Sequence, residues 1–135
     1  MTATNNGEAD LLNLVFKSSG PAWSADASFY ISLHTADPGE AGDQSTNESA
    51  YGSYARVAVS RTTGFSVSGN VASNVATIAF PAATSGSSTV THFGIGTSVT
   101  GAGRLLFAGA LTGSLAVTTG ITPQFAADQL RTTCD

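Results

Sequence analysis

The stretch from residue 29 to residue 59 decides the predicted fold, because two strand-like segments flank one long polar loop in it. Residues 29–34 read FYISLH and residues 54–59 read YARVAV, so apolar side chains recur at every second position. A period of two is typical of a strand with one buried face. The loop between the two segments is acidic and contains Asp37, Glu40, Asp43 and Glu48. Compact domains usually connect their elements with about 4–6 residues, so a loop of this length is the first place to look for function.

The composition predicts one soluble domain with an almost neutral surface. The chain has 135 residues, enough to bury a core without disulfides or metals, and only 10% of them are charged, against about 25% in an average domain. The net charge is -4, and the basic residues are scattered at Lys17, Arg56, Arg61, Arg104 and Arg131. Nucleic acid is therefore not an expected partner, since phosphate binding needs clustered Lys and Arg.

Cysteine content and hydropathy exclude further classes. The single cysteine, Cys134, allows no intramolecular disulfide and no thiolate metal cluster. No apolar run approaches the roughly 20 residues of a membrane span, and residues 1–8 lack the basic start of a signal peptide. We expect synthesis in the cytoplasm and no membrane partner.

Residues 1–27 are predicted to form an N-terminal arm with one short helix, ahead of a β-sandwich domain at residues 28–135. The helix is expected over residues 7–17, after a polar and extended start. Its apolar side chains are Leu11, Leu12, Val15 and Phe16. A helix of about ten residues is not stable alone, so this face is expected to dock on the domain or on a neighbouring subunit.

From residue 28 onward, short alternating segments predict an all-β antiparallel sandwich. The expected strands surround Phe29–Leu33, Val57–Val59, Phe65–Val67, a second segment ending at Val75, Ile78–Phe80, Thr89–Ile95, Leu105–Phe107, Leu115–Val117 and Gln124–Leu130. Strands at about 8–12-residue spacing with Gly and Ser punctuation are typical of sandwiches and barrels. The run from Val67 to Val75 repeats apolar residues every four positions, but its Gly, Asn and Val content favours strand, turn, strand over a helix.

No catalytic or metal site is expected, and no cofactor. The histidines, His34 and His92, fall at outward-facing positions of expected strands, and there is no Gly-x-Ser-x-Gly nucleophile motif. The loop acids lie at intervals of three rather than the alternate spacing of a calcium loop. The Gly94-Ile95-Gly96 run lacks the following helix of a nucleotide loop.

Two tyrosines and an arginine at the end of the loop are the remaining candidates for contact with a partner. Tyr51, Tyr54 and Arg56 belong to the residue types that dominate interface energetics. The alternative is structural: Tyr54 covers the sandwich edge and Arg56 pairs with a nearby acid.

Five blocks of this sequence resemble those of a known class of proteins: Tyr30–Gly42, Tyr54–Val59, Ile78–Thr84, Thr91–Gly96 and Leu105–Leu111. Together, over about residues 29–127, they resemble small structural proteins of tailed bacteriophages that are often labelled tail fibre proteins. They also resemble the cement, or decoration, proteins that coat some phage heads. The resemblance implies a jelly-roll-like sandwich and a place in the virion.

The compact, non-repetitive chain favours the cement reading over an elongated fibre shaft. A capsid cement protein would bridge neighbouring major capsid proteins on the capsid surface, and would itself bind as a homodimer or homotrimer. The alternative is a tail fibre or tail-associated receptor- or glycan-binding module, in which Trp23, Tyr51 and Tyr54 would stack on sugar rings.

Overall fold

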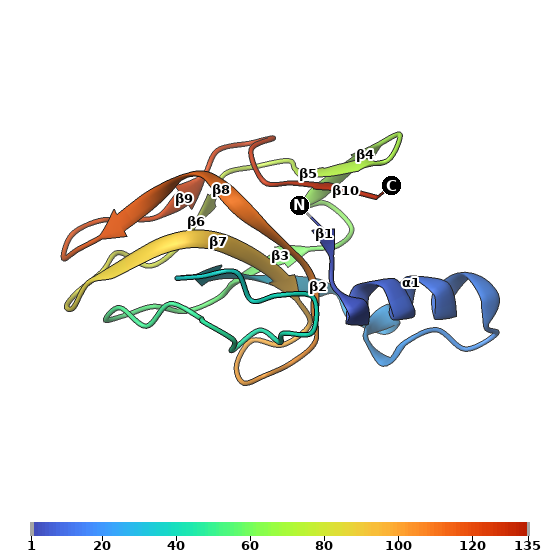
Figure 1. The fold of residues 1–135 in the computed structure, drawn as a ribbon. Helices are drawn as coiled ribbons and strands as arrows, with labels where there is room; N and C mark the ends of the chain where they lie inside the picture. The colour runs from blue at the N-terminus through green and yellow to red at the C-terminus, as the bar shows by residue number, and fades with distance from the viewer. Residues whose placement is uncertain (1, 135) are drawn as a thin grey trace.

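The computed structural model describes residues 2–134, and these form an all-β antiparallel sandwich with one α-helix near the N-terminus (Figure 1). The helical elements are α1 (Asn5–Phe16) and the 3-10 turn η1 (Ala22–Ala25). The strands are β1 (Thr2–Ala3), β2 (Ser28–His34), β3 (Val57–Ser60), β4 (Phe65–Ser68), β5 (Val71–Asn74), β6 (Ile78–Ala79), β7 (Ser88–Gly96), β8 (Leu105–Val117), β9 (Gln124–Phe125) and β10 (Arg131–Thr133). The predicted fold class is confirmed.

One large sheet and two small ones make the two layers of the sandwich. The large sheet has the order β1-β8-β7-β2-β3, and the small ones are β10-β5-β4 and β6-β9. All pairings are antiparallel. In Figure 1 the small sheets lie over one face of the large one, and α1 projects from the end of the body.

The core lies between the layers and follows the period of two in β2 and β7. Ile31 faces Ile95 and Leu33 faces Phe93 across the β2–β7 ladder, and all four are buried. Phe93 meets Phe125 of β9 edge to face, with ring centroids 5.8 Å apart. The alternation read from residues 29–33 therefore selects the core face correctly.

Irregular pairing explains where the predicted strands differ from the observed ones. Val90 pairs with Leu115 and His92 with Ala110, so four residues of β8 stand opposite the single residue Thr91. Val90 and Phe93, three positions apart and therefore on opposite faces of a regular strand, both join the core across this bulge. The segments around Leu105 and Leu115 are thus one long strand with a bulge, where two strands were predicted.

The C-terminal segment also departs from the prediction. The expected strand Gln124–Leu130 ends after Phe125, and the chain turns through Asp128, whose φ is 66°, before β10 begins. The strand-turn-strand prediction for residues 67–75 is confirmed by the β4–β5 hairpin, with Gly69 in the turn at φ 60°.

The helix starts earlier than predicted and is docked only at its base. Thr4 caps it by accepting a hydrogen bond from the Gly7 amide, so the start of the chain is not extended throughout. A Cβ on Gly7 would lie 2.1 Å from the Leu106 carbonyl oxygen, so only glycine allows α1 to approach β8 this closely. Since β1 also pairs with Ala108 and Phe107, the predicted arm is part of the large sheet.

Candidate functional site

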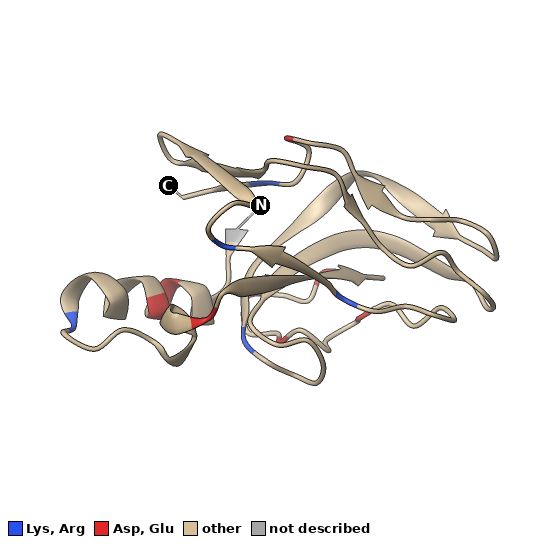
Figure 2. Ribbon diagram, turned by 180° about the vertical axis from the view of Figure 1, so that it is seen from behind, with Lys and Arg blue, Asp and Glu red and all other residues tan. Residues whose placement is uncertain are grey.

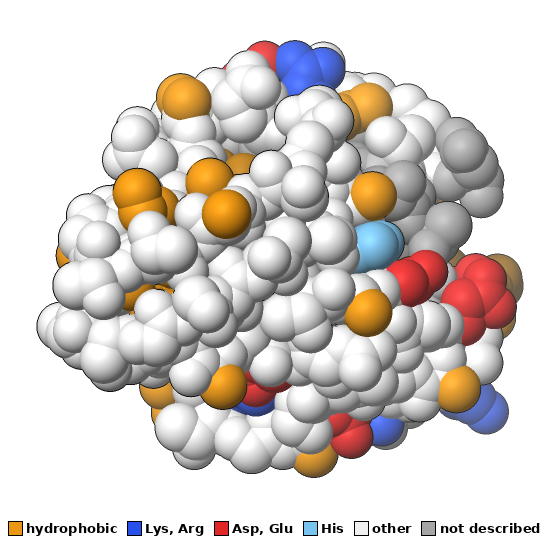
Figure 3. Space-filling view, turned by 60° about the vertical axis from the view of Figure 1, so that its left-hand side comes forward, with side chains coloured by type: hydrophobic (Ala, Val, Ile, Leu, Met, Phe, Trp, Pro, Cys, Tyr) orange, Lys and Arg blue, Asp and Glu red, His pale blue; other side chains and the backbone are white. Residues whose placement is uncertain are grey.

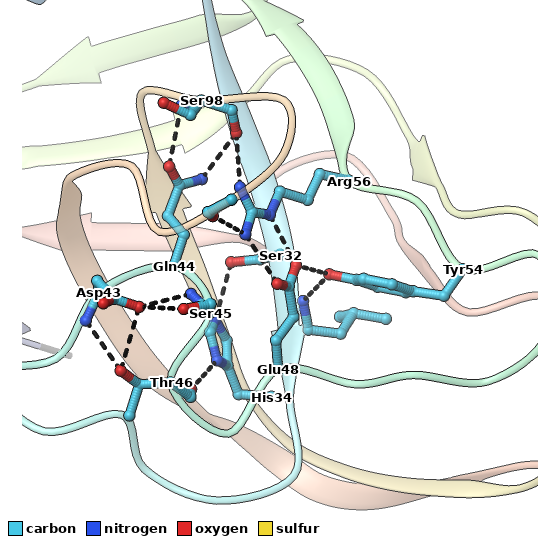
Figure 4. Close-up of polar contacts among 12 residues, drawn as sticks. Ser32, His34, Asp43, Gln44, Ser45, Thr46, Glu48, Tyr54, Arg56 and Ser98 are labelled. Atoms are coloured by element: carbon cyan, nitrogen blue, oxygen red, sulfur yellow. Dashed lines mark hydrogen bonds and ion pairs between the residues drawn. The ribbon is translucent and has the colours of Figure 1, made fainter.

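The long loop between β2 and β3 folds back over the face of the large sheet that lies away from the core, and it covers part of that face (Figure 4). The Ser49 amide donates to the Leu33 carbonyl oxygen over 2.8 Å, and His34 forms a β-bridge with Glu48. In the same loop, the backbone N–H of Gln44 donates to the Ala102 carbonyl oxygen over 2.8 Å. The loop is therefore an ordered layer of the fold.

The strongest polar cluster under this layer joins Glu48, Arg56 and Tyr54. The Arg56 guanidinium donates to both Glu48 carboxylate oxygens, from Nε over 2.7 Å and from Nη2 over 2.8 Å. The Tyr54 hydroxyl donates to Glu48 Oε1 over 2.7 Å and accepts from the Leu33 amide over 3.1 Å. Burial and the Glu48 carboxylate both raise the pKa of Tyr54. Only 3% of the Arg56 side chain and 16% of the Glu48 side chain remain exposed.

Arg56 also forms hydrogen bonds to a second loop, the one between β7 and β8. Its Nη1 donates to the Ser98 carbonyl oxygen over 2.9 Å, and its Nη2 donates to the Gly101 carbonyl oxygen over 2.6 Å. Four acceptors on two loops thus converge on one cation, a planar fork geometry that only Arg supplies. The arrangement binds loop to loop and uses four of the five guanidinium N–H groups.

His34 lies beneath the same loop and is fully buried, although its position in β2 predicts an outward-facing side chain. Its Nδ1 lies 2.8 Å from the Thr46 carbonyl oxygen, and its Nε2 lies 2.8 Å from Ser32 Oγ. A neutral ring satisfies both contacts when Nδ1 carries the proton and the Ser32 hydroxyl donates to Nε2. The histidine therefore acts as a structural bridge between strand and loop.

Acid is expected to loosen this layer through His34. Burial lowers the pKa of His34, against smaller raising effects from the Thr46 carbonyl and Glu48, while Arg56 and His92 add to the lowering. The unfolded chain, with a His pKa of about 6.5, then binds more protons than the folded chain just below that pH. Stability is fully present above pH 6.5 and falls as the pH drops below it, by at most about 1.4 kcal/mol per pH unit.

Urea denaturation at pH 7.5, 6.5 and 5.5 measures this dependence. A His34→Gln variant should lose most of the decline between pH 6.5 and 5.5, whereas His92→Gln should retain it. An unchanged decline in His34→Gln would assign the effect to other groups.

The buried side chain of Gln44 occupies space that a glycine at the end of β7 leaves open. Its amide nitrogen donates to the Ser98 carbonyl oxygen over 3.1 Å, and its Oε1 accepts from the Ser98 amide over 2.9 Å. A Cβ on Gly96 would lie 2.1 Å from Gln44 Cδ, and one on Gly94 would lie 2.8 Å from His34 Nε2. The Gly94-Ile95-Gly96 run thus makes room for the buried side chains of His34 on β2 and Gln44 on the loop.

The loop acids are used to shape the backbone. Asp43 accepts from the Ser45 amide over 2.8 Å and from its hydroxyl over 2.6 Å, and these bonds lower the pKa of Asp43. Asp37 accepts from the Gly39 amide over 2.9 Å. Within residues 2–134, no group of three or more His, Cys, Asp or Glu side chains could hold a metal ion.

The predicted contact residues of the loop lie inside the fold. Tyr51 is 3% exposed and donates to the Pro81 carbonyl oxygen over 2.8 Å, while Tyr54 stacks on Phe80. Arg56 is paired with Glu48, so each of the three side chains makes its main contacts within the fold. A contact between the loop and a partner would use the outer surface of the loop.

The predicted helix face behaves differently, because its side chains remain exposed. Leu11, Leu12, Val15 and Phe16 are 43%, 59%, 65% and 77% exposed. Leu14, which was not among the predicted residues, is 45% exposed. Only Gly7 and Asp10 of α1 are buried. Asp10 attaches the base of the helix to the rest of the fold. Arg104 Nη2 lies 2.8 Å from its Oδ1, and the Trp23 indole donates to its Oδ2 over 2.6 Å.

Charge is sparse over the rest of the molecule. Figure 2 shows the Lys, Arg, Asp and Glu positions scattered along the ribbon, and the sequence from Leu105 to Ala127 contains none of them. The face in Figure 3 is mostly uncharged, with hydrophobic side chains in small separate patches. Such a surface favours contact with other protein over binding of charged ligands.

No helix in the described part of the chain is long and apolar enough to cross a membrane.

Comparison with known families identifies the chain. No curated protein sequence matches it. Residues 2–133 match the family described as "Podophage GP4 fiber I protein gp80", and this range is nearly the whole chain. The protein therefore belongs to the podophage GP4 fiber I protein gp80 family and is a structural component of a phage virion.

Proposed function

We propose that this chain is a fibre subunit of a podophage virion, with a structural rather than a catalytic role. The observation that carries the proposal is the match to a fibre protein family over residues 2–133. The matched range includes the helix, the sandwich and the long loop between β2 and β3.

The geometry supports a building-block role. The buried polar groups of the outer layer, including His34, Gln44 and Arg56, are used to hold loops together. Among the described residues, no buried side-chain nitrogen or oxygen lacks a hydrogen-bond partner. The projecting half of α1, from Leu11 to Phe16, gathers five of the exposed large apolar side chains on one element. An apolar helix face of this kind is suited to attachment to another subunit.

A head cement role is the second candidate, and the compactness of the fold favours it. The chain is a single sandwich without repeats, and its low-charge surface suits lateral packing on a shell. In that role its partner would be the major capsid protein, on the capsid surface. A glycan-binding role receives less support, because Tyr51 is enclosed and Tyr54 is stacked on Phe80 rather than open to a sugar ring.

Location and copy number in the virion separate the two candidates. We expect antibody labelling and electron cryomicroscopy of purified virions to place the protein on fibres, with tens of copies or fewer per particle by quantitative mass spectrometry. Several hundred copies on the head shell would replace the fibre proposal with the cement role. Absence of the protein from purified virions would overturn both.

A further inference from the structure

The loop between β7 and β8, residues 97–104, lies between the base of α1 and the long loop, and none of its own side chains is buried. Its two ends are bonded to each other. The Thr97 backbone N–H donates to the Arg104 carbonyl oxygen over 3.1 Å, and the Arg104 backbone N–H donates to the Thr97 hydroxyl over 3.1 Å. Because this loop contributes nothing to the core, its position depends on polar contacts with the segments on either side of it.

On one side, the β7–β8 loop is joined to α1 by an ion pair. Arg104 Nε donates to Asp10 Oδ2 over 2.9 Å, and Arg104 Nη2 donates to Oδ1 over 2.8 Å. The Asp10 side chain is only 6% exposed, and it also accepts the indole N–H of Trp23. Separation from Arg104 would leave an enclosed carboxylate without its counter-charge, which is costly. We therefore expect the base of α1 and the β7–β8 loop to move together.

On the other side, the β7–β8 loop is joined to the long loop through Gln44, which is fully buried. The Gln44 backbone N–H donates to the Ala102 carbonyl oxygen, and the side-chain amide bonds to both the N–H and the carbonyl oxygen of Ser98 (Figure 4). A Cβ on Gly103, whose φ is 53°, would lie 2.1 Å from Gln44 Oε1, so a glycine is needed where the loop closes over this side chain. If the β7–β8 loop lifts away, Gln44 loses all three hydrogen bonds at once.

A direct bond between α1 and the long loop completes the arrangement. The Asn5 backbone N–H, in the first turn of α1, donates to the Glu40 carbonyl oxygen over 2.9 Å. Arg56 strengthens the link between the two loops through the carbonyl oxygens of Ser98 and Gly101. The three segments thus form a closed ring in which each is bonded to the other two. Loss of one contact in such a ring frees the groups that the remaining contacts need in place, so the ring is expected to open cooperatively.

We propose that α1 is a latch on the long loop. The base of α1, the β7–β8 loop and residues 40–45 of the long loop open and close as one unit, while the strands of both layers stay paired. Units of this kind open at a lower free energy than the whole domain. The coupling is reciprocal, because each segment favours the closed state of the others. A partner that holds α1 against the body therefore orders the surface of the long loop, and a partner that lifts α1 releases that surface.

Asp10→Asn tests the latch from the helix side, with Glu8→Gln as the matched control. Both variants remove one carboxylate charge from α1, but Glu8 is exposed. Hydrogen exchange followed by NMR should show the backbone N–H groups of Gln44 and Ser98 exchanging roughly tenfold faster in Asp10→Asn. The Asn5 N–H should be accelerated by a similar factor. Exchange in the β2–β7 ladder and the β4–β5 hairpin should be unchanged, and Glu8→Gln should behave as the wild type.

Gln44→Ala tests the same unit from the loop side, with Gln129→Ala as its control. Gln129 is exposed on the segment between β9 and β10, so its replacement removes the same atoms elsewhere. Trp23 is the single tryptophan of the chain and is bonded to Asp10, so exchange of its indole N–H reports on the base of α1. This exchange should be faster in Gln44→Ala and unchanged in Gln129→Ala.

Three results would each overturn the latch. Acceleration confined to α1 and η1 in Asp10→Asn would show that the loops open independently of the helix. Equal acceleration in the β2–β7 ladder would show that only the whole domain opens. An unchanged Trp23 indole in Gln44→Ala would show that the loop does not act on the helix. Should Asp10→Asn fail to fold, Arg104→Gln breaks the same pair from its 45% exposed side, and the same exchange pattern is expected of it.

Discussion

Replacing Glu48 by alanine is expected to lower the free energy of unfolding by about 3–5 kcal/mol, the range for breaking a buried ion pair. The Arg56 side chain is 3% exposed, and both of its bonds to carboxylate oxygens would be lost together with the bond from Tyr54. The remaining guanidinium would be a buried charge without a counter-charge. Since small domains are stable by only about 5–15 kcal/mol, the variant would be close to unfolding. Guanidinium denaturation at pH 7 measures the loss.

Two controls separate the pair from its surroundings. Arg131→Ala removes an ion pair with Asp128 in which both side chains are more than half exposed, and it should change stability little. Replacing Glu48 by leucine together with Arg56 by methionine removes both charges, and it should recover most of the stability lost in Glu48→Ala. If Glu48→Ala is no more destabilising than Arg131→Ala, the cluster does not stabilise the loop layer.

Replacing Gly96 by alanine is expected to destabilise the protein by about 1–3 kcal/mol, although alanine is normally the better strand residue. The new Cβ would lie 2.1 Å from Cδ of Gln44, which is fully buried. Gln44 would have to move and release both of its hydrogen bonds to Ser98. Loss of these bonds leaves buried polar groups without partners, which adds to the strain. Urea denaturation should show a lower midpoint with an unchanged slope.

Gly113→Ala is the matched control, because no atom lies within 4 Å of the position of its Cβ. It should leave stability unchanged or raise it slightly. A double variant, Gly96→Ala with Gln44→Ala, should be less destabilised than the sum of the single variants, since shortening Gln44 removes the clash. Strict additivity would show that the two residues do not meet.

The parts of the fold that the sequence predicted are those governed by local periodicity. Phe29, Ile31 and Leu33 alternate without interruption, and β2 lies where they indicate, with its core face correctly identified. The β4–β5 hairpin was predictable because Gly69 and Asn70 favour a turn over a helix. Membership of a phage structural family was also expected from the resemblance, whereas the specific cement reading was not confirmed.

Contacts between distant segments were beyond prediction. His34 alternates as an outward residue, and nothing in its neighbourhood indicates that residues 35–56 return to cover it. Gln44 carries no motif, so its place above Gly96 had no local signal. The two glycines separated by one residue in β7 were the available hint, because missing side chains on one face of a strand indicate a close neighbour there.

For the helix, too, the local features were predictable and the contacts with distant segments were not. Its existence and its apolar face followed from composition, but the sequence does not show that the docked surface is made of Gly7 and Asp10 while the leucines stay outside. The small and charged residues hold its base through Leu106, Arg104 and Trp23.

The bulge in β8 has a consequence for how the protein behaves at high concentration. Beyond the two residues that pair with β1, one side of β8 has no strand beside it among residues 2–134. The segment from Gly109 to Val117 carries no charge that would repel another copy. A straight edge of this composition would invite sheet-to-sheet polymerisation. The four residues opposite Thr91 interrupt the edge midway, so an incoming strand finds no continuous row of amide and carbonyl groups. We therefore expect the irregular strand to weaken edge-to-edge pairing between copies of this protein.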